Sequence, residues 1–326
     1  PKTDLKAVKG LLPDSLAIKL KNYQIQKPFK TSLKLSGKFT YGNNPDIAAE
    51  FSTETNEIII ADKFQLKNAS FNGYLSNDLY KKNVLNASKK SRKDNKVAFK
   101  FIKAELEDIN IDVRDAYYQS TPDALNFIDA NIILEGSNET LVKLIETDNF
   151  DFEGGTFQLN ATILGDIPYP DQFLNKTTGH FKLDNTRAIL KKNGLQLPIQ
   201  TIDLSLDNEI STLNRLIVNL SNGENLVLTG TLNNISGLIS KKPTKATTSQ
   251  VFLNSETLNI NELIAMAKQF IPTSESSTSD RKTLHETLDA VYGQFHPQFN
   301  FDVKSLTYND VIINDVESKI ELTSPE

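Results

Sequence analysis

The side chains that most often carry out chemistry are sparse in this sequence. It contains three histidines, His180, His285 and His296, and no cysteine. The His285-Glu286 pair lacks the second histidine that a zinc-protease helix carries four residues further on, so we expect no metal site. Without cysteine, disulfides, thiolate nucleophiles and Cys-ligated metals are excluded.

The carboxylates do not form a recognisable site either. Asp108, Asp112 and Asp115 lack the glycine and the terminal glutamate of an EF-hand calcium loop, so we interpret them as solvent-facing strand carboxylates. There is no G-x-S-x-G elbow and no G-x-x-x-x-G-K loop. We therefore expect no catalytic residue, no cofactor and a non-enzymatic function. A carbohydrate-active enzyme with paired carboxylates is a weaker alternative, because Trp, a common sugar-stacking residue, is absent.

The elements that must position any site are strands. Between Gly155 and Asn234, five segments alternate apolar with polar residues and end at Gly, Asn or Asp, as half-buried strands do. They are GTFQLNATILG, GHFKLDN, LPIQTIDLSLDN, LNRLIVNLSNG and ENLVLTGTLNN. Along the whole chain, an apolar strand recurrently leads into Asn, Asp or Tyr and then a second strand, for example at Phe64, Ala104, Phe181 and Phe301. The spacing is irregular, which indicates degenerate β repeats.

The alternation places the apolar side chains on one face of the sheet. That face must be buried on something, because a large exposed apolar surface marks a binding site or an aggregation hazard. Either the sheet closes on itself as a sandwich or barrel, or it curls into a trough that holds an apolar ligand such as an acyl chain. The candidate lining residues are Phe157, Leu159, Ile163, Phe181, Leu183, Ile202, Leu204, Leu206, Leu226, Leu228, Phe299, Phe301 and Val303.

We expect one continuous elongated domain with four parts. Residues 1–150 form an N-terminal β segment with a short helix at 138–146 capped by Ser137, and residues 151–240 form the central antiparallel strands. Residues 241–297 form a linker and a helical hairpin, whose first helix is capped by Asn259, and residues 298–326 begin a further β repeat. The basic segment 80–96 is predicted to be a mobile loop; a site for anionic lipid head groups or an acidic partner is the less favoured interpretation.

Composition limits the partners. The chain has 326 residues and a formal net charge of −5, so it has no global excess of Lys and Arg for binding nucleic acid. It starts at Pro1, without a signal sequence, and has no apolar run long enough to span a membrane. We expect it to be a fragment of a longer protein.

Several segments together resemble the AsmA family of envelope proteins. The run from Ser36 to Asp78 contains a P-x-I-x-x-x-F strand, a polar turn and an L-x-N-x-x-F-x-G strand. AELEDINIDVRD resembles the strand pair that recurs in that family, SETLNINELI its strand-to-helix junction, and FNFDVKSLTYNDVIINDVESKIEL its C-terminal repeat. These motifs cover most of the chain, and its Asn-rich and Lys-rich loops suit a Bacteroidota-like member.

The resemblance implies a fold and a function. The fold would be mainly β: a long, highly curved antiparallel sheet, taco-like in section, built from degenerate repeats with a few short helices. The protein would be periplasmic, anchored in the inner membrane by a segment outside this sequence. It would shelter phospholipid acyl chains in its apolar groove during lipid transfer or outer-membrane lipid homeostasis, with other envelope proteins as further partners. The alternative function is a structural or adhesive β-sandwich module that binds another envelope protein.

Overall fold

The computed structural model describes most of the chain. The described residues are 2–11, 18, 21–37, 46–76, 95–120, 126–145, 147, 150–167, 170–191, 195–220, 223, 225–239, 247–262 and 295–321. They divide into two compact units. Unit 1 comprises Pro1–Glu135 and Thr162–Pro170, and unit 2 comprises Gly136–Ala161 and Asp171–Glu326.

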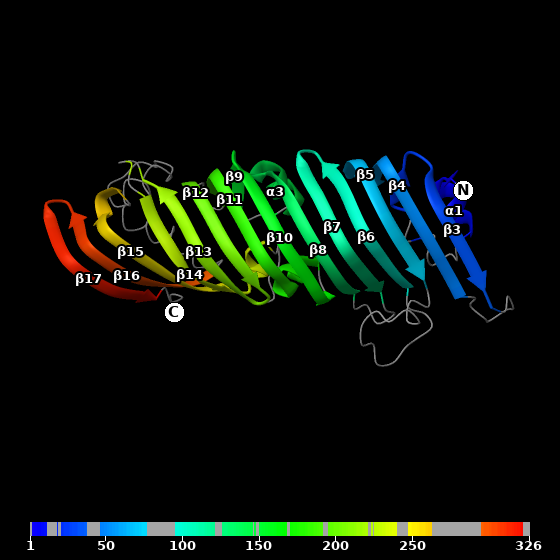
Figure 1. Ribbon diagram of the computed structural model, residues 1–326. Coiled ribbons are helices and arrows are strands. Elements are labelled where there is room, and N and C mark those ends of the chain that lie inside the picture. Colours follow the sequence, from blue (N-terminus) through cyan, green and yellow to red (C-terminus); the bar gives the residue numbers. More distant parts are fainter. Residues whose placement is uncertain are drawn as a thin grey trace. The chain divides into compact units, whose positions relative to one another are not determined.

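In its described residues, unit 1 is a meander of antiparallel strands with the short helix α1. Each strand from β3 to β7 pairs with the next strand along the chain, while β1 pairs with β3 and β2 with β4. The elements are β1 (Lys2–Thr3), α1 (Leu5–Leu11), β2 (Tyr23–Ile25), β3 (Phe29–Ser36), β4 (Asp46–Ile60), β5 (Phe64–Ser76), β6 (Asn95–Leu106), β7 (Ile109–Ser120) and β8 (Asn126–Ser137), which ends in unit 2. The strands are linked in hairpin order (Figure 1).

Unit 2 continues the same construction with one exception. Strands β11 to β15 pair antiparallel in chain order, β9 pairs with β11, and β16 pairs antiparallel with β17. The pair β15–β16 is parallel, in contrast to these antiparallel pairs. The elements are α3 (Asn138–Ile145), β9 (Phe150–Glu153), β10 (Thr156–Ile167, shared with unit 1), η2 (Pro170–Lys176), β11 (Thr177–Leu190), β12 (Leu195–Asp207), β13 (Ile210–Asn219), β14 (Asn225–Asn233), α4 (Ser236–Ile239), β15 (Thr247–Asn259), β16 (Phe295–Tyr308) and β17 (Val311–Glu321).

The predicted fold class is confirmed. The described part of the chain is mainly β, with 17 strands and a few short helices. Strands β10 to β14 coincide with the five segments that alternate between Gly155 and Asn234. The period of two was sufficient to find them, because each of these strands has one face turned to apolar neighbours and the other to solvent.

The repeated Asn and Asp residues have a different role from the one predicted. Asn68 and Asn185 lie inside the single strands β5 and β11, where two strands were expected, and their φ angles are 49° and 52°. Asp115 in β7 and Asp315 in β17 adopt the same left-handed conformation, with φ of 49° and 52°. Asn and Asp tolerate this conformation better than other side-chain-bearing residues. In β5 and β7 these residues fall at shifts of the strand register, which bend a strand and increase its twist.

The helix predictions have mixed outcomes. The Ser137 cap is confirmed, since its Oγ accepts a hydrogen bond from the Thr140 backbone N–H at 3.2 Å. Asn259 also acts as predicted: residues 260–262 are helical, and its Oδ1 accepts a bond from the Asn261 N–H at 3.0 Å. The remainder of the predicted hairpin, and residues 80–94 of the predicted basic loop, lie outside the described residues, whereas Asn95 and Lys96 belong to β6.

Gly230 tests the pairing of β14 with β15. A Cβ added there would lie 2.1 Å from the backbone oxygen of Gln250, so the two strands would have to separate. We expect Gly230→Ala to destabilise the protein by more than about 2 kcal/mol. The control is Gly10→Ala in α1, where an added Cβ has no neighbour within 4 Å. It should stabilise by about 0.5–1 kcal/mol. Equal thermal unfolding midpoints for the two variants would contradict the close approach.

Candidate functional site

The apolar side of unit 2 carries two clusters. The central cluster consists of Leu204, Leu206, Leu213 and Ile235 with six half-buried neighbours: Leu159, Leu174, Phe181, Ile202, Leu216 and Leu232. The C-terminal cluster consists of Leu253, Leu258 and Val303 with Leu226, Leu228, Ile260, Phe301, Leu306 and Val316. Nine of the thirteen predicted lining residues therefore belong to these two clusters.

The other four predicted residues are also placed. Phe157 is buried and stacks on Phe181, with ring centroids 6.4 Å apart, and Leu183 is buried on the same strand as Phe181. Phe299 stacks on Phe301 at 6.1 Å. Ile163 is buried but belongs to unit 1, so it is not grouped with the others.

The clusters combine closed and accessible parts. Leu174 of η2, and Ile235 next to α4, pack on the central cluster, and Ile260 packs on the C-terminal one. Predicted residues such as Leu204 and Val303 are buried and serve as core. Others on the same side, listed here, stay half-exposed: Leu159, Phe181, Ile202, Leu226, Leu228, Phe299 and Phe301. Because these side chains are only partly buried, they are the candidates for contact with a ligand.

Unit 1 contains an aromatic cluster that the sequence reasoning missed. Phe51, Phe71 and Phe99, on adjacent strands, contact each other edge to face, with centroids 5.6–6.3 Å apart. Gly73 makes room for them, because a Cβ there would lie 2.2 Å from the Phe51 ring. The signal in the sequence was the pattern Phe71-x-Gly73, in which a glycine stands at an inward strand position where an apolar side chain is expected.

The opposite side of unit 2 is a polar hydrogen-bonded surface. His180 Nε2 lies 2.8 Å from Asp203 Oδ1, which also accepts a bond from Asn214 at 2.7 Å. Lys182 pairs with Asp184 at 2.7 Å. Partial burial raises the pKa of Asp203, but the hydrogen bonds from Asn214 and His180 outweigh it and leave that pKa below its usual value. His180 thus takes part in a surface network that holds neighbouring strands together.

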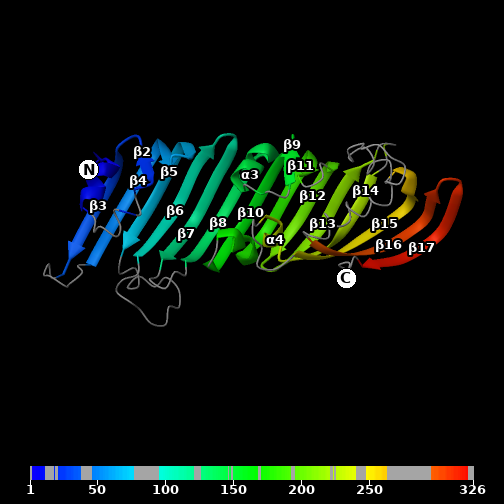
Figure 2. The ribbon, with the colours of Figure 1, turned by 180° about the vertical axis from the view of Figure 1, so that it is seen from behind.

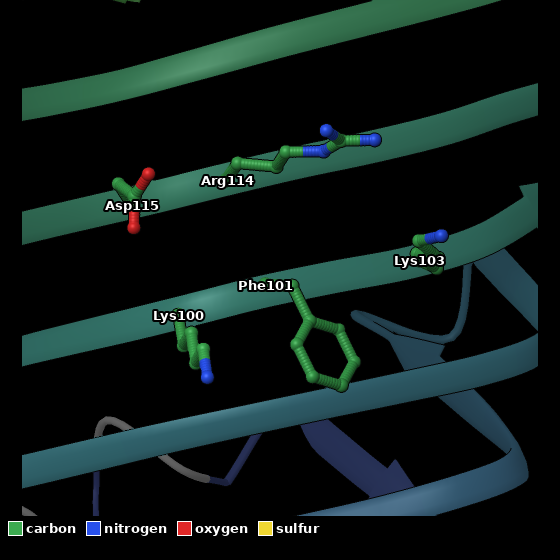
Figure 3. Close-up of a pocket in the computed structure, with 5 residues that line it drawn as sticks. All are labelled: Lys100, Phe101, Lys103, Arg114 and Asp115. Carbon is green, nitrogen blue, oxygen red and sulfur yellow. The ribbon is translucent and has the colours of Figure 1, made fainter.

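A shallow pocket lies on the polar side of β6 and β7 in unit 1 (Figure 3). Lys100, Phe101, Lys103, Arg114 and Asp115 line a volume of about 540 Å³. Asp112 lies beside it, 2.8 Å from Arg114 and 3.9 Å from Lys103, and the hydrogen bond from Arg114 lowers the pKa of Asp112. The cations are thus largely balanced by the carboxylates of Asp112 and Asp115.

Of the three aspartates interpreted as strand carboxylates, Asp112 and Asp115 lie in β7, whereas Asp108 lies in the turn before it. Asp108 and Asp115 are exposed, and Asp112 is tied to Arg114. Within the described ranges, no group of three or more His, Asp or Glu side chains is arranged to hold a metal ion. No helix in the described part of the chain is long and apolar enough to cross a membrane.

Comparisons with protein-family models, curated proteins and solved structures found no match. The resemblance to the AsmA family therefore rests on the sequence motifs alone. The apolar side of the strands is the best-defined feature of this candidate site.

The Asp203 network predicts a pH dependence of stability. A carboxylate whose pKa is lowered by folding stabilises the protein above its ordinary value of 3.8, and this stabilisation is lost as the pH falls below that value. Asp203→Asn should therefore be less stable than the parent at neutral pH. Between pH 5 and pH 2, the unfolding temperature of Asp203→Asn should also fall less than that of the parent. Thermal unfolding followed by circular dichroism measures both. Asn214→Ala removes one of the hydrogen-bond donors to Asp203. The fall in its unfolding temperature between pH 5 and pH 2 should therefore lie between those of Asp203→Asn and the parent. Identical pH profiles for Asp203→Asn and the parent would contradict the role of this network.

Proposed function

We propose that the apolar side of this protein binds the acyl chains of phospholipids. The observation that carries the proposal is the group of large, half-exposed apolar side chains on one side of the strands, with a hydrogen-bonded polar surface on the other. Leu226, Leu228 and Phe301, which pack against the C-terminal cluster, are the clearest examples, together with Phe299, which stacks on Phe301. A ligand that covers them must itself be apolar.

The binding mechanism is passive. Each CH₂ group moved from water to an apolar surface contributes about 0.8 kcal/mol of binding free energy. The affinity for an acyl chain therefore grows with the number of its CH₂ groups that the apolar side covers. The lining consists of aliphatic and aromatic side chains without a directional hydrogen bond, so no single position is strongly preferred. This favours sliding of the chain, while the head group stays in water. The function needs no catalytic residue and no cofactor.

The cellular setting belongs to the same proposal and is supported by the sequence resemblance. The protein would be an AsmA-like periplasmic segment of an inner-membrane-anchored protein that contributes to phospholipid transfer or outer-membrane lipid homeostasis. Its ligands would be phospholipids rather than nucleic acid, which agrees with the net charge of −5.

The alternative function, a structural or adhesive β module, is favoured by one observation. Leu174 and Ile235 pack on the central cluster, so part of the apolar side is closed by the chain itself. If that closure were complete, the apolar side would be a core only, and function would reside in a protein partner. Lipid binding distinguishes the two proposals.

The sharpest test uses two matched phenylalanines on neighbouring strands. Phe299 lies on the apolar side, opposite Val251, and Phe252 lies on the other side with 46% of its surface exposed. Phe299→Gln should weaken binding of a phospholipid with a fluorescent acyl chain about three- to tenfold, because it removes roughly 1 kcal/mol of apolar contact. Phe252→Gln should leave the affinity unchanged. Native mass spectrometry of the parent should detect retained phospholipid.

The outcomes separate the two functions. Absence of retained or exchangeable lipid in the parent would contradict the acyl-chain proposal and support the closed β module. Equal effects of the two phenylalanine variants, with both folded by far-UV circular dichroism, would also contradict it. Because Phe299 is half-exposed, its substitution should destabilise the fold less than substitution of the buried Leu204.

A further inference from the structure

A β-bulge in β6 turns one aromatic ring of unit 1 to the polar side of the sheet. Phe99 lies opposite Gly73 of β5. Phe101 lies opposite Asn72, the residue next to Gly73, so Lys100 is an extra residue in β6. Phe99 and Phe101 therefore point to opposite sides, although they are two residues apart. Phe99 joins the aromatic cluster of unit 1, whereas Phe101 lines the pocket on the polar side. Bulges often re-aim side chains in this way next to active sites.

The Phe101 ring gives this pocket an apolar surface. The ring is half-buried and lies between Lys100 and Lys103 of the same strand (Figure 3). Arg114 and Asp115 line the pocket from the neighbouring strand β7. Lysine and arginine supply hydrogen-bond donors, and the carboxylate of Asp115 supplies acceptors. The pocket thus combines a flat aromatic surface with polar groups of both kinds around it.

Two tyrosines extend the aromatic surface onto the strands beside β6. Strands β5, β6 and β7 lie side by side in both views (Figures 1 and 2). Tyr74 of β5 and Tyr117 of β7 are half-buried, and both lie opposite Ala98 of β6. Tyr74 is two residues from Asn72, which lies opposite Phe101, so all three rings are on the polar side. Neighbouring strands are about 4.8 Å apart, so the two tyrosines start from strands roughly 10 Å apart.

The charges around the pocket favour a neutral ligand. Asp112 lies 2.8 Å from Arg114 and 3.9 Å from Lys103, and Asp115 adds a second carboxylate to the lining. An anion such as phosphate would compete with Asp112 for these cations and would be repelled by Asp115. A ligand with hydroxyl groups can accept hydrogen bonds from the cations and also donate one to a carboxylate.

We propose that the polar side of unit 1 binds a neutral oligosaccharide on Tyr74, Phe101 and Tyr117. A pyranose ring has apolar C–H faces and a rim of hydroxyl groups. Its faces stack on the aromatic rings, and its hydroxyl groups bond to Arg114 and Asp115. Because the three rings belong to three neighbouring strands, they suit several consecutive sugars better than a single one. The proposed role is recognition of the sugar, and it is independent of lipid binding because these rings lie on the polar side.

The test is isothermal titration calorimetry of the 326-residue chain with neutral hexasaccharides of glucose, of mannose and of N-acetylglucosamine. At least one hexasaccharide should bind. Phe101→Ala and Tyr117→Ala should each weaken its binding at least about fivefold, because each removes one stacked ring. Phe101→Tyr, which keeps a ring, should retain the parent affinity. The matched control is Tyr118→Ala, because Tyr118 is 38% exposed and points to the other side of β7. Its affinity should equal that of the parent.

Three results would overturn the proposal. The first is that the folded parent binds none of the three hexasaccharides. The second is that Tyr117→Ala and Tyr118→Ala, both folded by far-UV circular dichroism, have the same affinity. The third concerns heparin, an anionic polysaccharide: if it binds more tightly than every neutral hexasaccharide and the binding weakens with salt, the surface is an anion site. Weaker binding in Tyr117→Ala than in Tyr118→Ala, with retained binding in Phe101→Tyr, supports the proposal.

Discussion

The structure depends on one constraint. Each strand has an apolar side and a polar side, and its apolar residues must stay on the same side along the whole strand. A shift of one residue would turn every side chain to the wrong face. The buried Leu204, Leu206 and Val303 and the polar pair of His180 with Asp203 lie on opposite sides because the constraint is obeyed. Partly buried apolar side chains beside this core, such as Phe301, lie on that side for the same reason.

The constraint is obeyed even where the strands are irregular. Asn68, Asp115, Asn185 and Asp315 adopt left-handed conformations within strands, which adds a bend while the apolar residues on either side remain on one face. In β11, for example, the buried Leu183 and Ala188 are an odd number of residues apart, on either side of Asn185. Asn or Asp recurs at these places in the degenerate repeats because it tolerates the left-handed conformation. That conformation bends the strands and so gives them their curvature.

Much of the fold was predictable because its signals are local. Alternation located β10 to β14, and Ser137 and Asn259 marked helix starts through hydrogen bonds to residues two or three positions away. What escaped prediction depends on residues far apart in sequence. Neither the parallel pairing of β15 with β16 nor the packing of Leu174 on the central cluster produces a periodic pattern in the sequence. For the same reason, the alternation identified the apolar side but could not separate core residues such as Leu204 from accessible ones such as Phe299.

The central claim is that acyl chains contact the accessible residues of the apolar side. The most direct measurement is photo-crosslinking with a phospholipid that carries a diazirine on its acyl chain, followed by mass spectrometry of the labelled peptides. The account predicts labels at Leu226, Leu228 and Phe299, on the apolar side, and none at the exposed Phe252 on the other side. Labels at Phe252 with none on the apolar side, or no labelling of the folded protein at all, would contradict it.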